Sequence, residues 1–131
     1  MSSPVECVCF VVVSGSKVLF ERRYYEDSVS THRINIPGGH IEHGESQEPA
    51  LFREIKEELD IIPLSYDFLG SHNFELTAKQ LLHYYLITEW KGELKAQEGQ
   101  RLQWLEPRKG LGINSVDQKV LDVASLWKAH T

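Results

Sequence analysis

The sequence predicts an α/β fold in which helices pack on the faces of a mixed β-sheet. Two observations predict this class: strand-like runs rich in β-branched and aromatic residues recur along the chain, and two amphipathic segments of helical period interrupt them. The 131 residues are enough for one sizeable core and few for two, and 41% hydrophobic with 25% charged residues is an ordinary globular composition. We therefore expect residues 1–131 to form one domain.

The first strands are predicted near the start of the chain. Cys7–Val13 and Lys17–Glu21 are dense in β-branched and aromatic residues, and the Ser-Gly-Ser sequence between them is typical of a hairpin turn. Ile34–Ile36 is a shorter strand-like piece. We predict a turn at Pro37-Gly38-Gly39, because glycine gives the backbone access to unusual dihedral angles.

The strongest helix signal follows. Ser46 is a good N-cap residue, and the helix is predicted to run from there to about Leu59. Leu51 and Ile55 recur with Leu59 at a spacing of four residues, so one face can pack on a sheet. Pro63 prevents any continuation of the helix.

The second half of the chain predicts a long strand and a last helix. Gln80–Trp90 reads as a central strand with few polar breaks, and Arg101–Leu105 reads as a short one. The last helix is predicted at Ser115–Lys128, with a capping box formed by Ser115 and Gln118. Its apolar stripe consists of Val116, Val120, Val123 and Trp127.

Charge and cysteine content limit the function classes. Fourteen Lys and Arg against nineteen Asp and Glu give a net charge of −5, so the basic face of a protein that binds long nucleic acid is not expected. Cys7 and Cys9 would share one face of a strand, and we predict reduced, buried thiols of a cytoplasmic protein. The apolar run at 7–13 is too short to span a bilayer, so we expect no membrane association.

Three acids on the first helix carry the chemistry. Glu54, Glu57 and Glu58 are spaced i, i+3 and i+4, which places them on one face, away from the apolar stripe. Carboxylates this close repel one another. They form either a solvated acidic face softened by neighbouring basic side chains, or a site for divalent cations. Backbone carbonyls of the preceding glycines and the carboxylate of Glu45 would add oxygen ligands, which favours the second interpretation.

These residues resemble a known motif. From Gly39 the sequence runs through five residues to Glu45, then through seven to Arg53-Glu54-Ile55-Lys56-Glu57-Glu58-Leu59-Asp60-Ile61. This is similar to the Nudix box, G-x5-E-x7-R-E-U-x-E-E-x-G-U, in which U is aliphatic. Eight of the nine defined positions match, and Asp60 replaces the last glycine. That glycine is interpreted as a left-handed helix cap, a conformation which Asp tolerates better than most residues.

The resemblance implies an α/β/α sandwich with a loop–helix catalytic motif, and hydrolysis of a nucleoside diphosphate derivative with Mg²⁺ or Mn²⁺. Position by position, the Gly38 carbonyl and the carboxylates of Glu54, Glu57 and Glu58 would hold metal. Gly39, Glu45 and Arg53 would shape and brace the motif.

Within the family, the chain is similar to the MutT type, which implies three further site residues. Glu98, in a hydrophilic loop, corresponds to an additional metal-binding or catalytic acid, with plain solvent exposure as the alternative. Asn114 corresponds to a residue that recognises the purine edge; alternatively, it is the N-cap of the last helix. Arg23 corresponds to a substrate-binding arginine, or it forms a solvated pair with Arg22.

The reaction expected from this resemblance is hydrolysis of a nucleoside triphosphate to the monophosphate and pyrophosphate, with an oxidised purine such as 8-oxo-dGTP as the leading substrate. Water is the nucleophile, and Glu54 or Glu98 accepts its proton. Two alternatives remain: a Nudix reaction on ADP-ribose, a nucleotide sugar or a dinucleoside polyphosphate, and a non-catalytic nucleotide-binding domain that regulates a partner. A small nucleotide is the expected partner of a monomer or homodimer.

Overall fold

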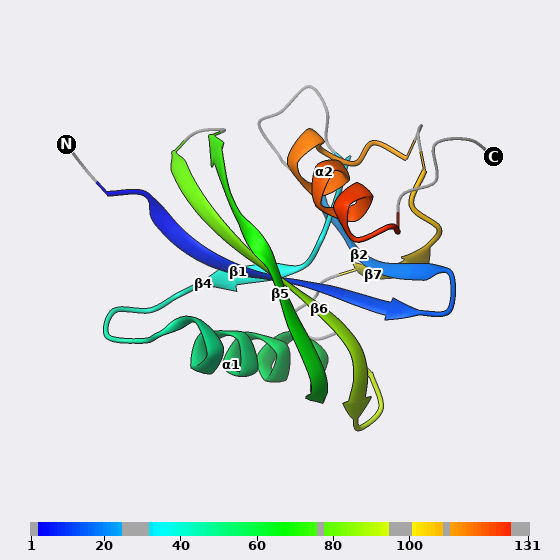
Figure 1. Cartoon of the computed structure of the whole chain (residues 1–131), viewed down its shortest axis with the longest axis horizontal. Helices are drawn as coiled ribbons and strands as arrows, with labels where there is room; N and C mark the ends of the chain where they lie inside the picture. Colours follow the sequence, from blue (N-terminus) through cyan, green and yellow to red (C-terminus); the bar gives the residue numbers. More distant parts are fainter. Residues whose placement is uncertain (1–2, 25–31, 76–77, 95–100, 109–110, 127–131) are drawn as a thin grey trace.

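The computed structural model describes residues 3–24, 32–75, 78–94, 101–108 and 111–126 (Figure 1). In this part of the chain, each of two runs of strands is followed by a helix. In order, the elements are β1 (Val5–Ser14), β2 (Lys17–Tyr24), β3 (His32–Asn35), β4 (Gly38–His40), α1 (Gln47–Leu59), β5 (Ile62–Glu75), β6 (Lys79–Lys91), β7 (Arg101–Leu105) and α2 (Ser115–Val123).

The sheet is mixed and is organised around β1. Its main path runs β3-β2-β1-β6-β5, with β4 paired to β1 and β7 paired to β2. The long pairing of β1 with β6 is parallel, and the other strand pairs are antiparallel. On its other edge, β1 meets β4 at Cys7–Cys9 and β2 at Val13 and Ser14. Two partners therefore share this edge of β1, and the sheet divides there.

The two helices cover opposite faces of this sheet, as Figure 1 shows. Successive side chains of β1 alternate between the faces: Val8 and Phe10 pack with α1, whereas Cys9 and Val11 pack with α2. The predicted mixed sheet with helices on its faces is confirmed. Within the described residues, neither helix is long and apolar enough to cross a membrane.

Several predicted elements are confirmed. The first hairpin turns at Gly15, whose φ of 62° is in the left-handed region. The predicted helix and the predicted central strand correspond to α1 and β6, and the short strand Arg101–Leu105 is β7 with the predicted bounds. Cys7 and Cys9 are free thiols, and both are buried. Asp60 ends α1 with φ 56° and ψ 40°, the left-handed cap that the sequence predicted.

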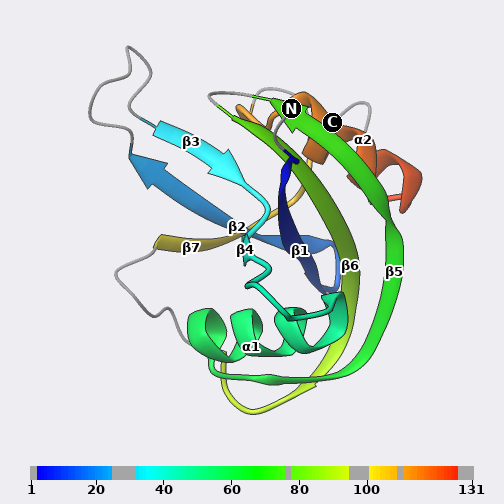
Figure 2. The ribbon, with the colours of Figure 1, turned by 90° about the vertical axis from the view of Figure 1, so that its left-hand side faces the viewer.

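The fourteen-residue strand β5 was not predicted. It forms the edge of the sheet beside β6, and Figure 2 shows it curving from the α2 side to the α1 side. Its pairing with β6 is interrupted by register shifts, one of them between Phe68 and Gly70. Leu64 is 63% exposed and Phe68 is 55% exposed. Irregular pairing and partial exposure remove the regular alternation that marks a strand in a sequence.

The predicted turn at Pro37-Gly38-Gly39 is wrong. Gly38 and Gly39 belong to β4, which pairs antiparallel with β1 and aligns them with Cys9 and Val8. Neither glycine has a positive φ. Glycine is required here for space: a Cβ on Gly38 would lie 2.5 Å from the carbonyl oxygen of Val8.

The last helix is shorter than predicted and begins with a different cap. Asn114 is the N-cap residue, and its side chain accepts from the Asp117 N–H at 2.8 Å, so the predicted capping box at Ser115 is wrong. The helix ends at Val123 rather than at Lys128. Ser125 has φ 60°, and the Leu126 N–H donates to the Leu121 carbonyl, which closes the helix in a Schellman motif.

Candidate functional site

Strand β4 brings the backbone of Gly39 directly against the carboxylate of Glu54 from α1. A Cβ added to Gly39 would lie 1.8 Å from Glu54 Oε2. The absent side chain therefore forms a cradle which the Glu54 carboxylate fills. This contact joins the two halves of the predicted motif, the glycines and the acidic helix.

The three helix acids occupy different environments. Glu54 and Glu58 are 9% and 4% exposed. Burial raises the pKa of Cys7, and the charge of Glu54 adds to this; burial raises the pKa of Cys9, with Asp117 as the next cause and Glu58 as a smaller one. Glu57 lies at the surface, with a side chain that is 45% exposed. The acidic face is therefore two buried carboxylates with an exposed one beside them.

Arg53 ties the loop before α1 to the helix. Its Nε donates to Glu45 Oε2 at 2.7 Å and its Nη2 donates to Glu45 Oε1 at 2.8 Å, which is a bidentate ion pair. Nη2 also donates to the His40 carbonyl at 2.9 Å. On the helix itself, Nη1 lies 3.3 Å from Glu57 Oε2 and 3.6 Å from Glu54 Oε1. The structure thus brings the two predicted brace residues into direct contact.

The brace changes the acidity of Glu45. The hydrogen bond from Arg53 lowers the pKa of this carboxyl group to about 2, with help from the Glu42 backbone N–H. The same pair raises the pKa of the Arg53 guanidinium. Both groups therefore stay charged throughout the neutral range.

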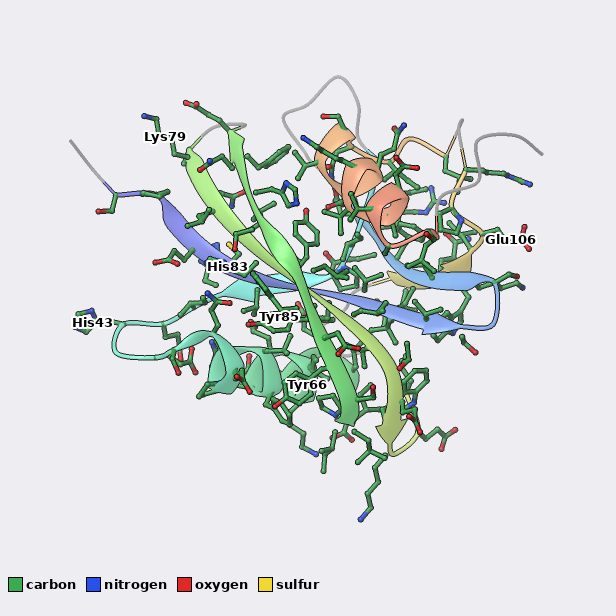
Figure 3. All side chains as sticks on the ribbon, viewed as in Figure 1. His43, Tyr66, Lys79, His83, Tyr85 and Glu106 are labelled. Atoms are coloured by element: carbon green, nitrogen blue, oxygen red, sulfur yellow. The ribbon has the colours of Figure 1, made fainter. Side chains whose placement is uncertain are left out.

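Two tyrosines hold the first turn of α1 against the sheet. Tyr85 from β6 donates to Gln47 Oε1 at 2.7 Å, and Tyr66 from β5 donates to Glu48 Oε1 at 2.7 Å. Both labelled rings lie on the α1 side of the sheet in Figure 3, with centroids 6.5 Å apart. The predicted N-cap, Ser46, makes no side-chain cap hydrogen bond. These phenols therefore position the start of the acidic helix.

A cavity of about 340 Å³ extends from the glycines toward the start of α2. Gly38 and Gly39 line one part of it, and Asn114 and Asp117 line another. Its wall also includes the buried carboxylate of Glu21, the two thiols and the phenol of Tyr84. The cavity therefore reaches from Gly39, which lies against Glu54, to a polar cluster at the start of α2, and none of its described lining residues comes from α1.

The polar cluster is built around Asp117, which sequence reasoning missed. Asp117 is 3% exposed and accepts from the Ile36 N–H, the Tyr84 hydroxyl and the Asn114 amide. Burial raises its pKa, although these three hydrogen bonds act in the opposite direction. No local sequence pattern predicts this cluster, because Ile36 and Tyr84 lie far from Asp117 in the sequence. A polar residue on the inner face of α2 was the available signal.

Two predicted site residues are not placed by the structure. Glu98 lies outside the described residues. The backbone of Arg23 belongs to β2, but its side chain is not among those that the structure describes. Their predicted roles, like the ligand roles of Gly38, Glu54, Glu57 and Glu58 and the base contact of Asn114, remain predictions.

The predicted ligands have the donor chemistry of a divalent-cation site. Carboxylate and carbonyl oxygens are the ligands that Mg²⁺ and Mn²⁺ prefer, and the Gly39 cradle leaves room for the Glu54 carboxylate beside the Gly38–Gly39 backbone. Among the described residues, no three Asp, Glu, His or Cys side chains converge closely enough to hold an ion. The predicted ligands therefore match a divalent cation in donor type, and in the structure Glu57 is paired with Arg53.

Comparison with known proteins gives a family match over most of the chain. Residues 4–122 match the family model described as the NUDIX domain. The 8-oxo-dGTP diphosphatase of Escherichia coli (strain K12) is 29% identical over 108 residues, 82% of this chain and 81% of that protein. The CTP pyrophosphohydrolase of the same strain is 32% identical over 108 residues, 82% of this chain and 79% of that protein.

Solved structures agree with the fold. The solution structure of the E. coli ORF135 protein gives a TM-score of 0.77 at 27% identity, covering 94% of this chain and 89% of that one. The crystal structure of a MutT NUDIX hydrolase from Burkholderia pseudomallei gives a TM-score of 0.75 at 20% identity, covering 92% and 98%. The second likeness concerns the fold alone.

Proposed function

Because this chain belongs to the NUDIX domain family, we propose that it hydrolyses a nucleoside triphosphate to the monophosphate and pyrophosphate. The leading substrate is an oxidised purine nucleotide such as 8-oxo-dGTP. The observation that carries this proposal is the cavity that reaches from Gly39, whose backbone lies against the Glu54 carboxylate, to the polar cluster at Asn114 and Asp117. The acids of α1 beside Gly39 would form the charged end of the site for phosphates, and the polar cluster would form its hydrogen-bonding end for a base.

The charged end needs a divalent cation, because the carboxylates of α1 would otherwise repel a polyphosphate. Members of the family generally use such a metal, and Mg²⁺ or Mn²⁺ is the proposed ion. Glu54, Glu57, Glu58 and the Gly38 carbonyl would hold it, together with Glu98. When bound, the ion supplies positive charge against the phosphate oxygens and the leaving group.

The chain's own residues then have three tasks. The Glu54 carboxylate, which is 9% exposed, accepts the proton of the attacking water, and Glu98 is the rival for this role. Arg53 and Glu45 hold α1 and the loop before it in a fixed relative position through their bidentate ion pair. Arg23 contacts the substrate, and Asn114 contacts the edge of the base.

CTP is a second candidate substrate, favoured by the 32% identity to the CTP pyrophosphohydrolase. A purine occupies more space than a pyrimidine and offers a different pattern of donors and acceptors. The two candidates therefore differ in the base that the polar cluster at Asn114 and Asp117 must recognise.

The test is a hydrolysis screen of the purified protein with Mg²⁺ and with Mn²⁺. The panel contains canonical and oxidised nucleoside triphosphates, ADP-ribose, a nucleotide sugar and a dinucleoside polyphosphate, and the products are identified by chromatography. We expect 8-oxo-dGTP to give 8-oxo-dGMP and pyrophosphate with the highest kcat/KM. Release of orthophosphate, or turnover confined to the compounds that are not triphosphates, would contradict the proposal.

A further inference from the structure

Three polar side chains from three neighbouring strands form a row across the sheet. Ser71 of β5 lies opposite His83 of β6, which is labelled in Figure 3, and Val8 of β1 lies opposite His83 on its other edge. Glu6 precedes Val8 by two residues on β1, so both side chains point to the α1 face of the sheet. None of the three polar residues is among the described lining residues of the cavity, so the row lies outside the site proposed above.

Two short hydrogen bonds at the His83 ring join the row. The ring Nδ1 lies 2.6 Å from Ser71 Oγ, and Nε2 lies 2.8 Å from Glu6 Oε1. His83 is 4% exposed, whereas Ser71 is exposed at the edge of the sheet and the Glu6 side chain is 52% exposed. The imidazole is therefore a buried link between two groups that a small molecule can reach.

Glu6 decides which nitrogen of the ring carries the proton. An ionised carboxylate only accepts hydrogen bonds, so Nε2 is the protonated nitrogen of the neutral His83 ring. Nδ1 then keeps its lone pair, and the Ser71 hydroxyl donates to it. A serine hydroxyl, a basic ring nitrogen and a carboxylate that orients the ring are together the parts of an activated nucleophile.

The surface around Ser71 leaves room for a small acyl group. β5 is an edge strand, and among the described residues no strand pairs with its outer edge. Backbone N–H groups on such an edge can donate to the carbonyl oxygen of a substrate. A Cβ added to the preceding Gly70 would have only the His72 ring nitrogen within 4 Å in the described part of the chain, at 3.8 Å. An acyl donor can therefore approach the hydroxyl from the outer side of β5.

We propose that Ser71 is a nucleophilic serine that accepts an acyl group from an activated acyl donor, such as a thioester or an aryl ester. Its Oγ attacks the carbonyl carbon, a C–O ester bond forms, and the bond from that carbon to the thiolate or aryloxide breaks. The hydroxyl proton passes to His83 Nδ1 and from there to the leaving group or to solvent, which regenerates the neutral ring. Glu6 stabilises the transient imidazolium. This second reactive centre does not depend on the proposed nucleotide hydrolysis.

The first experiment compares two serines within the wild-type protein. The protein is incubated with p-nitrophenyl acetate, and the acetylation rate of each serine is measured by quantitative peptide mass spectrometry. Ser16 is the internal control, because it is also exposed and its hydroxyl donates to the Glu106 carboxylate, a weaker base than an imidazole. We expect Ser71 to react at least about 10²-fold faster than Ser16, the low end of the gain from general-base catalysis. Equal rates would overturn the proposal.

The variant His83→Gln separates the chemistry of the ring from its packing. A glutamine amide can accept from Ser71 and donate to Glu6 as the ring does, but it cannot take up the proton. Acetylation of Ser71 should therefore fall to about the rate of Ser16, while far-UV circular dichroism and the thermal midpoint check that the fold is kept. A histidine that only links the strands would leave the acetylation rate of the variant unchanged, and that result would overturn the proposal.

A spectroscopic measurement on the wild type tests the positioning role of Glu6 and does not depend on how a variant folds. At about pH 9, where an ordinary imidazole is neutral, the ¹⁵N chemical shifts of the His83 ring should show a protonated Nε2 and an unprotonated Nδ1. In Glu6→Ala the two tautomers should mix, and acetylation of Ser71 should slow by about tenfold, the usual scale of one charge-assisted hydrogen bond. A protonated Nδ1 in the wild type would overturn the proposal, because that nitrogen could not accept the serine proton.

Discussion

The two ends of the proposed site are held in different ways. At the α1 end, an ion pair holds the loop to the helix: Arg53 binds Glu45 with two hydrogen bonds in a partly exposed position. At the α2 end, the buried Asp117 carboxylate is surrounded by the neutral donors of Tyr84, Asn114 and the Ile36 backbone. The first arrangement suits charged phosphates and cations, and the second suits the uncharged hydrogen-bonding edge of a base.

This difference places the proposed hydrolysis at the α1 end and the proposed base recognition at the α2 end. Changes at the α1 end are expected to alter turnover and leave base preference intact. Changes at the α2 end are expected to do the reverse. Glu54→Gln and Gly39→Ala test the first half of this statement, and Arg53→Gln and Asp60→Gly test how the α1 end is held together.

The largest effect is expected from Glu54→Gln. Loss of the carboxylate that accepts a proton lowers kcat by about 10²–10⁴-fold. The Kd of 8-oxo-dGMP measured without metal should stay within about twofold of the wild-type value, because the base end is untouched. Glu89→Gln, at an exposed position of β6, is the control and should keep full activity. Equal kcat in Glu54→Gln and wild type would remove Glu54 from the mechanism.

Gly39→Ala should act almost as strongly on activity. Its Cβ would overlap the Glu54 carboxylate, which is the far end of a flexible side chain and moves aside. Displacement by about 1 Å costs on the order of 10²-fold in rate, while urea denaturation should show little change. Gly38→Ala, in contrast, places its Cβ 2.5 Å from the Val8 carbonyl oxygen and should lower the free energy of unfolding by about 1–3 kcal/mol. Similar stability losses in both variants would contradict the cradle.

The Arg53–Glu45 ion pair predicts how the stability of the fold depends on pH. Glu45 titrates at about 2 in the folded protein, below the value of about 4.3 for an unfolded chain. A lowered pKa stabilises the fold above the unfolded value, and this stabilisation is lost as pH falls toward 2. In Arg53→Gln the pKa of the Glu45 carboxyl should rise toward its unfolded value in a ¹³C NMR pH series, and the variant's stability deficit should vanish near pH 2. An unchanged Glu45 midpoint in Arg53→Gln would contradict the brace.

The smallest effect is expected from Asp60→Gly. Asp60 has φ 56°, a conformation that glycine adopts at lower cost, but the substitution also removes the ion pair with Lys56. Exposed pairs of this kind contribute about 0.3–0.5 kcal/mol. We expect a net stabilisation of up to about 1 kcal/mol in urea denaturation, with unchanged kcat. A loss of stability would show that Asp is better suited to this cap than glycine.

The sequence could predict the α1 end because its groups lie close together in the chain. Gly39, Glu45, Arg53 and the acids fall within 23 residues, so helical period and loop length bring them together. The resemblance to the Nudix box placed the left-handed cap at Asp60, where the box has a glycine, and the structure confirms it. The predicted reason for the two glycines was wrong, however. They are required because β4 pairs closely with β1 and Gly39 contacts Glu54, and not because the chain turns there.

The α2 end could not be predicted in the same way. Asp117 meets Ile36 across 81 positions and Tyr84 across 33 positions of the sequence, and no local pattern encodes such contacts. For Asn114, the sequence left two interpretations open: the structure confirms the N-cap, and the base contact stays a prediction. The edge strand β5 was missed for a related reason, because register shifts and exposure obscure its alternation.

The central claim is that the substrate lies between the cation-binding acids of α1, next to Gly39, and a base site at Asn114, with the cavity between them. A crystal grown with Mn²⁺ and 8-oxo-dGMP tests it most directly. The account predicts anomalous density among the carboxylates of Glu54, Glu57 and Glu58, and a purine whose N7 side faces Asn114. A purine bound outside the cavity, or manganese bound away from all three carboxylates, would contradict it.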